Sequence, residues 1–392
     1  MRLKTILKPC VLGIVVVSSA LAFNLSAEVI FEENFDDQPD WTSAMHSSST
    51  VQRAATDIIP TGWYSIRQDP KWAPSTGHPD RHETIEILAS NADKARGGTG
   101  KSFVSYRDSF DQNYWPSESM LLKYFPVGFD QIYVEFWIRF DPNWTRSLAG
   151  GLTGSVSKMF RISSWSETGS EYQAFPGGDL GPMAIWDYSM NTYGMRAGLA
   201  LRGGPHGDNY KFTQHDIPDI GHFITPGSLG GFNISLKSHL DGMGANGENP
   251  NLPDRVNGGL LKDSSGVVEH DQLFGSGDSW TKLGFFVKMN SAPDRKDGEF
   301  RMWLSDKQII VSKKIPWIRS SNTQNQNAKW NIVAIGGNDY FRTYPDTDRH
   351  EEWYSIDDLV IRNDIPSYLE SQFHNGSGNM LSPNPPGDIG VK

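Results

Sequence analysis

The chain has 392 residues, a formal net charge of −10 and an aromatic fraction of 12%. An acidic chain of this kind excludes a general affinity for nucleic acid or for anionic membranes, because its overall field repels polyanions. Cys10 is the single cysteine, so a disulfide within the chain is excluded as well.

The first 27 residues predict a signal for export. Basic residues precede the short apolar stretch 11–22, and small residues end at Ala22 and again at Ala27, as they do at signal cleavage sites. The apolar stretch is too short to cross a membrane. We therefore expect residues 1–27 to be a signal peptide, the mature protein to be secreted or periplasmic, and no membrane to be bound.

Beyond residue 27, apolar and polar residues alternate in one short segment after another, and Gly, Pro, Asn and Asp separate these segments. Such alternation predicts β-strands, because successive side chains of a strand point to opposite faces. The expected strands are Val29–Phe35, Thr84–Leu88, Lys101–Arg107, Ser119–Phe125, Gln131–Phe140, Val156–Ile162, Met183–Tyr188, Gly194–Leu201, Thr281–Asn290, Glu299–Leu304, Gln308–Lys313, Asn331–Gly336 and Trp353–Arg362. We expect an all-β fold, an antiparallel β-sandwich of the jelly-roll type with long loop insertions.

The pattern also predicts how the chain is organised. We expect one domain over residues 28–373, because no linker interrupts the series of strands. Residues 203–278 break the alternation and predict a loop-like insertion, and loops of this length are commonly functional. Residues 374–392 are polar and rich in Gly and Pro, which predicts a flexible tail.

The expected strand 131–140 divides into two faces. Its apolar set, predicted to point into the core, is Ile132, Val134, Phe136, Ile138 and Phe140. The opposite set is Gln131, Tyr133, Glu135, Trp137 and Arg139. Two interpretations of the opposite set remain open. It is either an ordinary outer sheet face with cross-strand pairs, or a face whose aromatics stack on sugar rings while its polar groups bind hydroxyls.

Other expected strands place cations and aromatics opposite a core-forming set. Lys288, Arg301 and Trp303 do so between 281 and 304, and Arg196 and Arg202 do so between 194 and 202. We expect Tyr133, Trp137, Arg139, Arg196, Lys288 and Trp303 to line one concave sheet face, with Glu135, Arg202 and Arg301 as further substrate-binding residues. Local cations would let an acidic protein hold an acidic polysaccharide.

Several segments resemble a known family. SWTKLGFFVKMNSAPDRKDGEFRMWLSDKQII, over residues 279–310, resembles a strand–turn–strand pattern of secreted concanavalin A-like jelly-roll polysaccharide lyases and related carbohydrate-active proteins. WYSIDDLVIRND is similar to their closing strand, FEENFDD to their opening strand, and RGGTGKSFVSYRD to an early strand. The resemblance implies a secreted lyase that cleaves a uronate-containing polysaccharide by β-elimination.

A lyase of this kind abstracts the proton next to a uronate carboxylate, so it needs a cation at the carboxylate and an acid and base. That step requires no cofactor. The candidate neutralising residues are Arg139, Lys158, Arg196 and Lys288, and the candidate acid/base residues are Tyr133, Tyr188 and His222. A purely structural role for His222 remains an open alternative.

Two other functions remain open. A glycoside hydrolase needs two carboxylates about 5–10 Å apart, and the E-x-D-x-x-E pattern of jelly-roll glucanases does not occur in the chain. A non-catalytic, lectin-like carbohydrate-binding protein is the second alternative, because the fold hosts both classes. In every case the expected partner is a polysaccharide, and we expect a monomer.

Acidic residues next to the terminal strands predict a structural cation. Asp36 and Asp37 follow the first expected strand, and Asp357 and Asp358 lie in the last one. Terminal strands of jelly rolls commonly lie side by side, and carboxylates brought together there would repel unless a hard cation such as calcium joined them. We expect Asp36 and Asp358 to bind calcium. Solvated turn carboxylates are the alternative.

Overall fold

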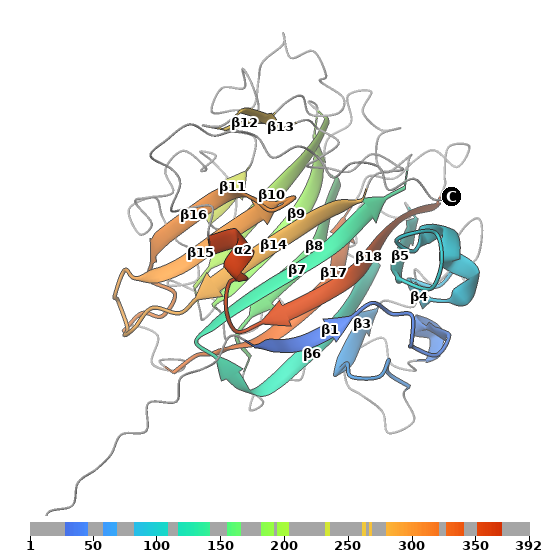
Figure 1. Cartoon of the computed structure of the whole chain (residues 1–392), viewed down its shortest axis with the longest axis horizontal. Helices are drawn as coiled ribbons and strands as arrows, with labels where there is room; N and C mark the ends of the chain where they lie inside the picture. The colour runs from blue at the N-terminus through green and yellow to red at the C-terminus, as the bar shows by residue number, and fades with distance from the viewer. Residues whose placement is uncertain are drawn as a thin grey trace, which may run out of the picture.

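The computed structural model describes residues 28–45, 58–68, 82–108, 117–141, 155–165, 182–191, 194–203, 232–235, 261–263, 266–268, 280–320, 327–340 and 351–370. Within these ranges the chain forms two large antiparallel sheets that pack face to face (Figure 1). The fold is therefore an all-β sandwich of the jelly-roll type, as the alternation predicted.

The first sheet has nine strands in the described part of the chain. Its order is β16 (Lys307–Ile315), β15 (Gly298–Leu304), β14 (Thr281–Lys288), β7 (Gln131–Phe140), β18 (Glu351–Arg362), β5 (Phe103–Asp108), β4 (Ile85–Ile87) and β2 (Trp41–Thr42), and β1 (Val29–Glu33) also pairs with β18. The first and last strands of the domain therefore lie side by side, as expected. Two 3₁₀ turns, η1 (Ser43–Met45) and η3 (Ala89–Lys94), connect strands at the β2 end.

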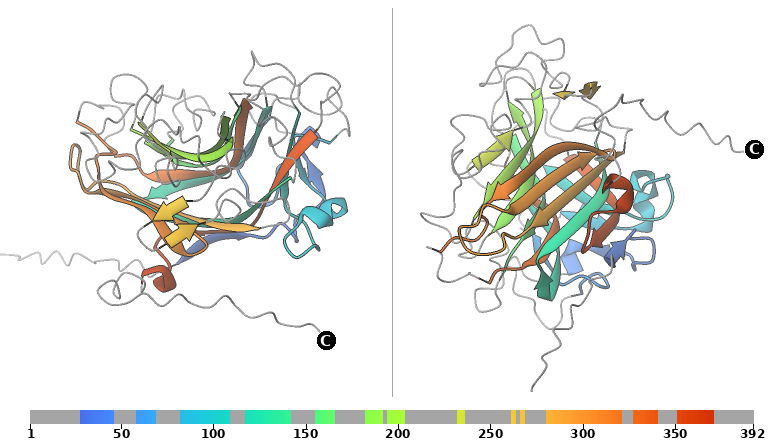
Figure 2. Two further views of the ribbon diagram at one scale, coloured as in Figure 1. Left: turned by 90° about the horizontal axis from the view of Figure 1, so that it is seen from above. Right: turned by 60° about the vertical axis from the view of Figure 1, so that its left-hand side comes forward.

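The second sheet has seven described strands. Its order is β11 (Phe232–Ser235), β10 (Gly194–Arg202), β9 (Met183–Asn191), β8 (Ser155–Ser163), β17 (Trp330–Tyr340), β6 (Ser117–Phe129) and β3 (Ser65–Gln68). A separate pair consists of β12 (Leu261–Asp263) and β13 (Gly266–Val268). The seven-stranded sheet curves so that its outer face is the hollow one (Figure 2, left).

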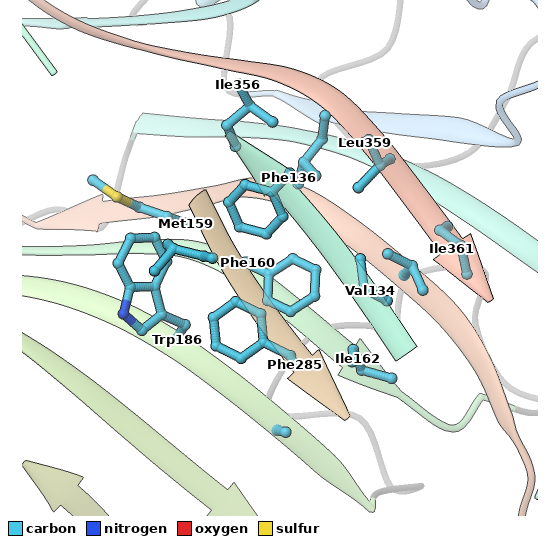
Figure 3. Packing of buried hydrophobic residues seen from close by; sticks show 14 of the residues in the cluster. Val134, Phe136, Met159, Phe160, Ile162, Trp186, Phe285, Ile356, Leu359 and Ile361 are labelled. Atoms are coloured by element: carbon cyan, nitrogen blue, oxygen red, sulfur yellow. The ribbon is translucent and has the colours of Figure 1, made fainter. Parts of the chain in front are cut away.

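The core lies between the inner faces of the two sheets. The predicted apolar set of β7 is buried there, together with the apolar sets of β14 and β15. Aromatic rings join the sheets: Phe285 of β14 lies 4.7 Å from Phe160 of β8 between ring centroids, and Phe136 of β7 lies 5.0 Å from the same ring. Figure 3 shows this packing with Trp186 of β9 beside it.

Every strand expected from the alternation exists, with ends shifted by a few residues. The sequence did not predict β2, β3, β11, β12 or β13, which have two to four residues each, too few for a periodic pattern to be recognised. Three of these, β11 to β13, lie within the predicted insertion 203–278. The predicted signal peptide and the predicted tail lie outside the described residues.

No helix among the described residues is long and apolar enough to cross a membrane. The one described α-helix, α2 (Ser367–Glu370), follows the last strand of the sandwich. It lies against the outer face of the nine-stranded sheet, in front of β14 and β15 in Figure 1. That face therefore does not form an open surface along its whole length.

Candidate functional site

The predicted site residues are divided between the two sheets. Those in the nine-stranded sheet are Tyr133, Glu135, Trp137, Arg139, Lys288, Arg301 and Trp303, and those in the seven-stranded sheet are Lys158, Tyr188, Arg196 and Arg202. The sheets pack by their inner faces, so their outer faces lie on opposite sides of the molecule. The expectation that Arg196 shares one concave face with Tyr133 and Lys288 is therefore wrong. His222 lies outside the described residues.

Tyr133 and Trp303 do point away from the main core, but α2 covers them. Both side chains are 1% exposed, and they form a second apolar cluster with Phe286, Ile365 and Leu369. The two rings meet edge to face, with centroids 5.6 Å apart. Rings buried in this way cannot stack on a sugar, so the prediction that they line a groove is wrong.

Glu135 joins this cluster through a polar network. Its Oε2 accepts hydrogen bonds from the hydroxyls of Tyr133 at 2.7 Å and Tyr368 at 2.8 Å, and it lies 3.1 Å from Nζ of Lys282. Burial, and after it the charge of Glu135, raises the pKa of Tyr133 far above its ordinary value. Tyr133 therefore keeps its proton and is poorly suited to the role of general base.

The remaining predicted cations of this face have partners within the protein. Arg301 donates to Glu299 at 2.5 Å, and Lys288 lies 3.8 Å from the same carboxylate. Arg139 lies over the rings of Trp280 and Trp353 and donates to the backbone of η3. Such contacts fit the other interpretation of this face, an outer surface with cross-strand pairs.

The outer face of the seven-stranded sheet has a different set of charges. Directly paired residues of neighbouring strands share a face, as do residues two apart in one strand. Arg161 of β8 lies two residues before Ser163, so the two share a face. Ser163 pairs with Met183 of β9, and Met183 pairs with Arg202 of β10, so Arg202 lies on the same face. Arg161 is fully buried, whereas Arg202 is partly exposed.

A third arginine lies on this face, at the other end of the sheet. Arg67 of β3 pairs with Met120 of β6, and Leu122, two residues further on, pairs with Ala334 of β17. Ala334 also pairs with Arg161. Arg67, Arg161 and Arg202 therefore project from one hollow face, although they are far apart in the sequence.

A β-bulge in β8 adds a fourth cation. The pairing of β8 with β9 shifts between Lys158 and Phe160, and both Met159 and Phe160 belong to the main core. Two consecutive inward side chains break the alternation, so Lys158 and Arg161, on either side of them, both lie on the outer face. The charged residues of this face whose burial is described, Arg67, Lys158, Arg161 and Arg202, are basic. Two acidic residues also occupy register positions of this face: Asp187 pairs with Lys158, and Glu118 comes two residues before Met120.

Next to Arg161, β17 contains an irregularity of its own. Its pairing with β8 shifts between Ile335 and Asp339, and Gly336 has a φ of 75°. A Cβ at Gly337 would lie 1.9 Å from the carbonyl oxygen of Lys158 and 2.9 Å from Nη2 of Arg161. The two strands therefore approach each other closely, and the approach depends on glycine.

Aromatic side chains gather beside the arginines. Tyr64 and Tyr124 lie 5.1 Å apart between ring centroids, and Trp165 lies 5.0 Å from Tyr124. They pack on the small apolar cluster of this face, which contains Met120, Leu122, Ile332 and Ala334. The face combines aromatic surface with positive charge, the combination that the sequence predicted for the other sheet.

Sequence reasoning missed Arg67 and Arg161. Strict alternation over 156–162 groups Lys158 with the core residues Phe160 and Ile162, and the bulge reverses that assignment. Two adjacent large apolar residues between two cations, KMFR, were the available signal. Arg67 lies in a four-residue strand with too little pattern to be found.

The predicted calcium ligands remain untested. Asp36 Oδ1 accepts a hydrogen bond from the backbone N–H of Lys101 at 2.8 Å, and Asp358 forms an ion pair with Arg96. Among the described residues, no three or more His, Cys, Asp or Glu side chains form a group that could hold a metal ion. Structural calcium therefore stays a prediction from the sequence.

No protein-family model matches the chain, and no curated protein matches it in sequence. Solved structures similar to it include alginate lyase Aly36B in complex with alginate tetrasaccharide, at 10% identity and a TM-score of 0.40 over 84% of this chain and 95% of that one. Alginate lyase vAL-1 from Chlorella virus has 13% identity and a TM-score of 0.35, over 67% of this chain and 84% of the lyase. The laminarinase catalytic domain from Thermotoga maritima MSB8 has 9% identity and a TM-score of 0.35, over 87% of this chain and 99% of the laminarinase domain.

The fold class of this protein is the two-sheet jelly-roll sandwich. The likeness to carbohydrate-active enzymes extends over most of each chain, but identities of this size identify no activity. The candidate functional site is the face that bears Arg67, Lys158, Arg161 and Arg202.

Proposed function

We propose that this protein is an exported polysaccharide lyase that cleaves a uronate-containing polysaccharide by β-elimination. The observation that carries the proposal is the basic, partly aromatic outer face of the seven-stranded sheet, with Lys158 and Arg161 at its centre. A net charge of −10 would repel a polyanion. The cations Arg67, Lys158, Arg161 and Arg202 supply positive charge locally, where the polymer would bind.

The spacing of the arginines suits a polymer that lies across the strands. Arg202 and Arg161 are two strands apart, and Arg161 and Arg67 are three strands apart. At about 4.8 Å per strand, the distances across the strands are about 10 Å and about 14 Å, and each outer arginine is also offset from Arg161 by two residues, about 7 Å, along the strands. A polyuronate placed across the sheet would therefore meet positive charge at several sugars, with Arg161 between the outer two arginines.

In the elimination, a base removes the C5 proton next to the carboxylate. The electron pair forms a C4–C5 double bond, the C4–O bond to the next sugar breaks, and the departing oxygen receives a proton. Negative charge accumulates on the carboxylate in the transition state, where a cation that is already in place stabilises it. Lys158 is partly exposed and can reach that carboxylate from the face. Arg161, fully buried next to it, adds a fixed positive charge beneath the carboxylate.

The base and acid would come from the same face. Tyr64 and Tyr124 lie there, next to Trp165. Tyr188, in β9, and His222 remain candidates from the sequence. Export, a monomeric state and structural calcium also belong to the proposal as predictions from the sequence.

The experiment is an ultraviolet assay of the purified mature protein against alginate, polygalacturonate, polyglucuronate and neutral laminarin. Elimination creates an unsaturated sugar that absorbs in the ultraviolet, and hydrolysis does not. We expect absorbance to rise with at least one polyuronate and not with laminarin. New reducing ends without absorbance would indicate a hydrolase, and binding without cleavage would indicate a lectin; either result contradicts the proposal.

Substitution of the central cation gives a second test. Because a charge-assisted hydrogen bond contributes about 1.5–3 kcal/mol, Arg161→Met should lower kcat/KM about tenfold to a hundredfold. Lys329→Met is the control, since Lys329 is a partly exposed cation that pairs with Asp130 near the β6–β7 turn. Arg202→Gln replaces a partly exposed arginine and checks the face if Arg161→Met folds poorly. Turnover at the wild-type rate in both arginine variants would contradict the assigned face.

A further inference from the structure

The two irregular strands at the centre of the seven-stranded sheet meet at Arg161. The bulge of β8 turns Arg161 to the outer face, and the irregularity of β17 places Gly337 against its guanidinium. Bulges occur often next to active sites, where they redirect a side chain. Here one bulge lies on each of two neighbouring strands, and both act on the same arginine.

The space around Gly337 decides where the guanidinium can lie. An added Cβ would be 2.9 Å from Nη2 of Arg161, which is closer than real Cβ contacts. Arg161 is fully buried, so a shift of its guanidinium away from position 337 would have to take place inside the protein. Any side chain at position 337 would therefore displace the guanidinium, the β17 backbone or both.

We infer that Gly337 is a positioning residue for the proposed elimination. By lacking a side chain, it lets the guanidinium of Arg161 lie against β17 and so fixes where this buried positive charge lies beneath the uronate carboxylate. The inference rests on the proposed function. It also makes Gly337 a determinant of specificity, because a displaced cation would lose its advantage for a polyuronate and leave the affinity for a neutral polymer unchanged.

The close approach of the β8 and β17 backbones is a simpler reason for a glycine at position 337. The same Cβ would lie 1.9 Å from the carbonyl oxygen of Lys158, so an alanine would disturb the backbone whatever Arg161 does. Gly336 provides the matched control: its Cβ would lie 1.8 Å from the carbonyl oxygen of Ser119, and its other nearest contacts are to Ser119 and Phe103, not to Arg161. Gly336→Ala and Gly337→Ala both disturb the irregular part of β17, but only the Cβ at position 337 comes close to Arg161.

The experiment is a double-mutant cycle. Gly337→Ala and Gly336→Ala are each made in the wild-type protein and in Arg161→Lys, which keeps the charge but removes the forked head group. For each variant, kcat/KM and the Kd for alginate are measured, together with the free energy of unfolding in urea. Because a misplacement of about 1 Å can cost about a hundredfold, we expect Gly337→Ala to lower kcat/KM tenfold to a hundredfold.

In the Arg161→Lys background, Gly337→Ala should lower kcat/KM by a factor at least about fivefold smaller than in the wild type, because the Cβ still meets the backbone of Lys158 but the guanidinium is absent. Gly336→Ala should change kcat/KM by the same factor in both backgrounds, because its Cβ does not reach Arg161. Equal losses from Gly337→Ala with and without the arginine would overturn the inference, and so would wild-type activity in Gly337→Ala. If Gly337→Ala does not fold, Arg161→Lys decides, because it keeps the charge and moves it: a tenfold or larger loss of kcat/KM supports the inference, and the wild-type rate contradicts it.

The two proposals can fail separately. If the wild type releases no unsaturated product but binds alginate, and Gly337→Ala weakens that binding while Gly336→Ala does not, the elimination is wrong and the positioning role stands. If the wild type is a lyase and Gly337→Ala matches its rate, the elimination stands and the positioning role is wrong. If alginate is neither cleaved nor bound, and no other polyuronate is, both are overturned.

Discussion

Cations on both outer faces of this sandwich alternate in sequence with core residues, but the charged groups around them differ between the two faces. Arg301 and Lys288 each lie opposite a core-facing set, and both meet the carboxylate of Glu299. Arg161 also lies opposite core residues, and it shares its face with the cations Arg67, Lys158 and Arg202. Surface ion pairs such as those of Arg301 and Lys288 contribute little to stability. Arg161 is fully buried, and it adds fixed positive charge beneath the partly exposed Lys158 and Arg202.

His82 and Glu86 form a second pair whose charge depends on its surroundings. His82 Nδ1 lies 3.2 Å from Glu86 Oε2, and the imidazole stacks on Tyr106 with ring centroids 4.1 Å apart. The hydrogen bond to Glu86 raises the pKa of His82 above 6.5, although burial opposes it. Burial alone would raise the pKa of Glu86, but hydrogen bonds from His82 and Asn91 hold it below its ordinary value.

The raised pKa of His82 predicts how stability depends on pH. The folded state binds the proton more tightly than the unfolded state, so this contribution is complete below the unfolded pKa of about 6.5 and is lost as pH rises through the folded pKa. We expect His82→Gln to flatten the fall in the free energy of unfolding between about pH 6 and about pH 8. Urea unfolding across that range measures it. A curve parallel to that of the wild type would contradict the assignment, and Glu86→Gln should reproduce the flattening.

At the scale of elements, α2 has an importance that its four residues do not suggest. Leu369 is fully buried against Tyr133 and Trp303, and Tyr368 donates to Glu135. The helix thereby closes part of the outer face of the nine-stranded sheet. That closure is the reason why Tyr133 of β7 and Trp303 of β15 form a satellite core, in which their rings have no free face for a sugar.

Loss of the α2 contact should therefore be costly. Leu369→Ala should lower the free energy of unfolding by about 2–5 kcal/mol, as other buried leucine truncations do. Val127→Ala is the control, because Val127 is 89% exposed and its truncation should cost less than about 0.5 kcal/mol. Urea unfolding of both variants measures the difference. Equal stability of the two variants would show that α2 is only loosely attached.

At the scale of the whole molecule, the sandwich closes by pairing its ends. β1 pairs with β18, and Asp36 and Asp358 lie close to that junction, where Lys101 and Arg96 bind them. The sequence predicts that calcium also binds these carboxylates. If it does, extensive dialysis against a chelator should lower the melting temperature, and added calcium should restore it, because a ligand that binds only the folded state stabilises it. An unchanged melting temperature would contradict the prediction.

Strand positions and the membership of the core could be predicted because they are local properties. Alternation in 131–140 and 281–290 identified both the strands and the side chains that the core buries. The exceptions have local causes too: β3 is short, and the bulge at Met159 and Phe160 interrupts the period of two. One inserted residue reverses the face of every side chain that follows.

The sequence by itself determined an all-β sandwich, its main core and the presence of cations and aromatics opposite that core. Only the tertiary structure decided which outer face is hollow and basic, and which one α2 covers. The physical reason is the range of the interactions. Alternation depends on neighbours within one strand, whereas Arg67, Arg161 and Arg202 share a face only because β3, β8 and β10 pair into one sheet across long stretches of chain.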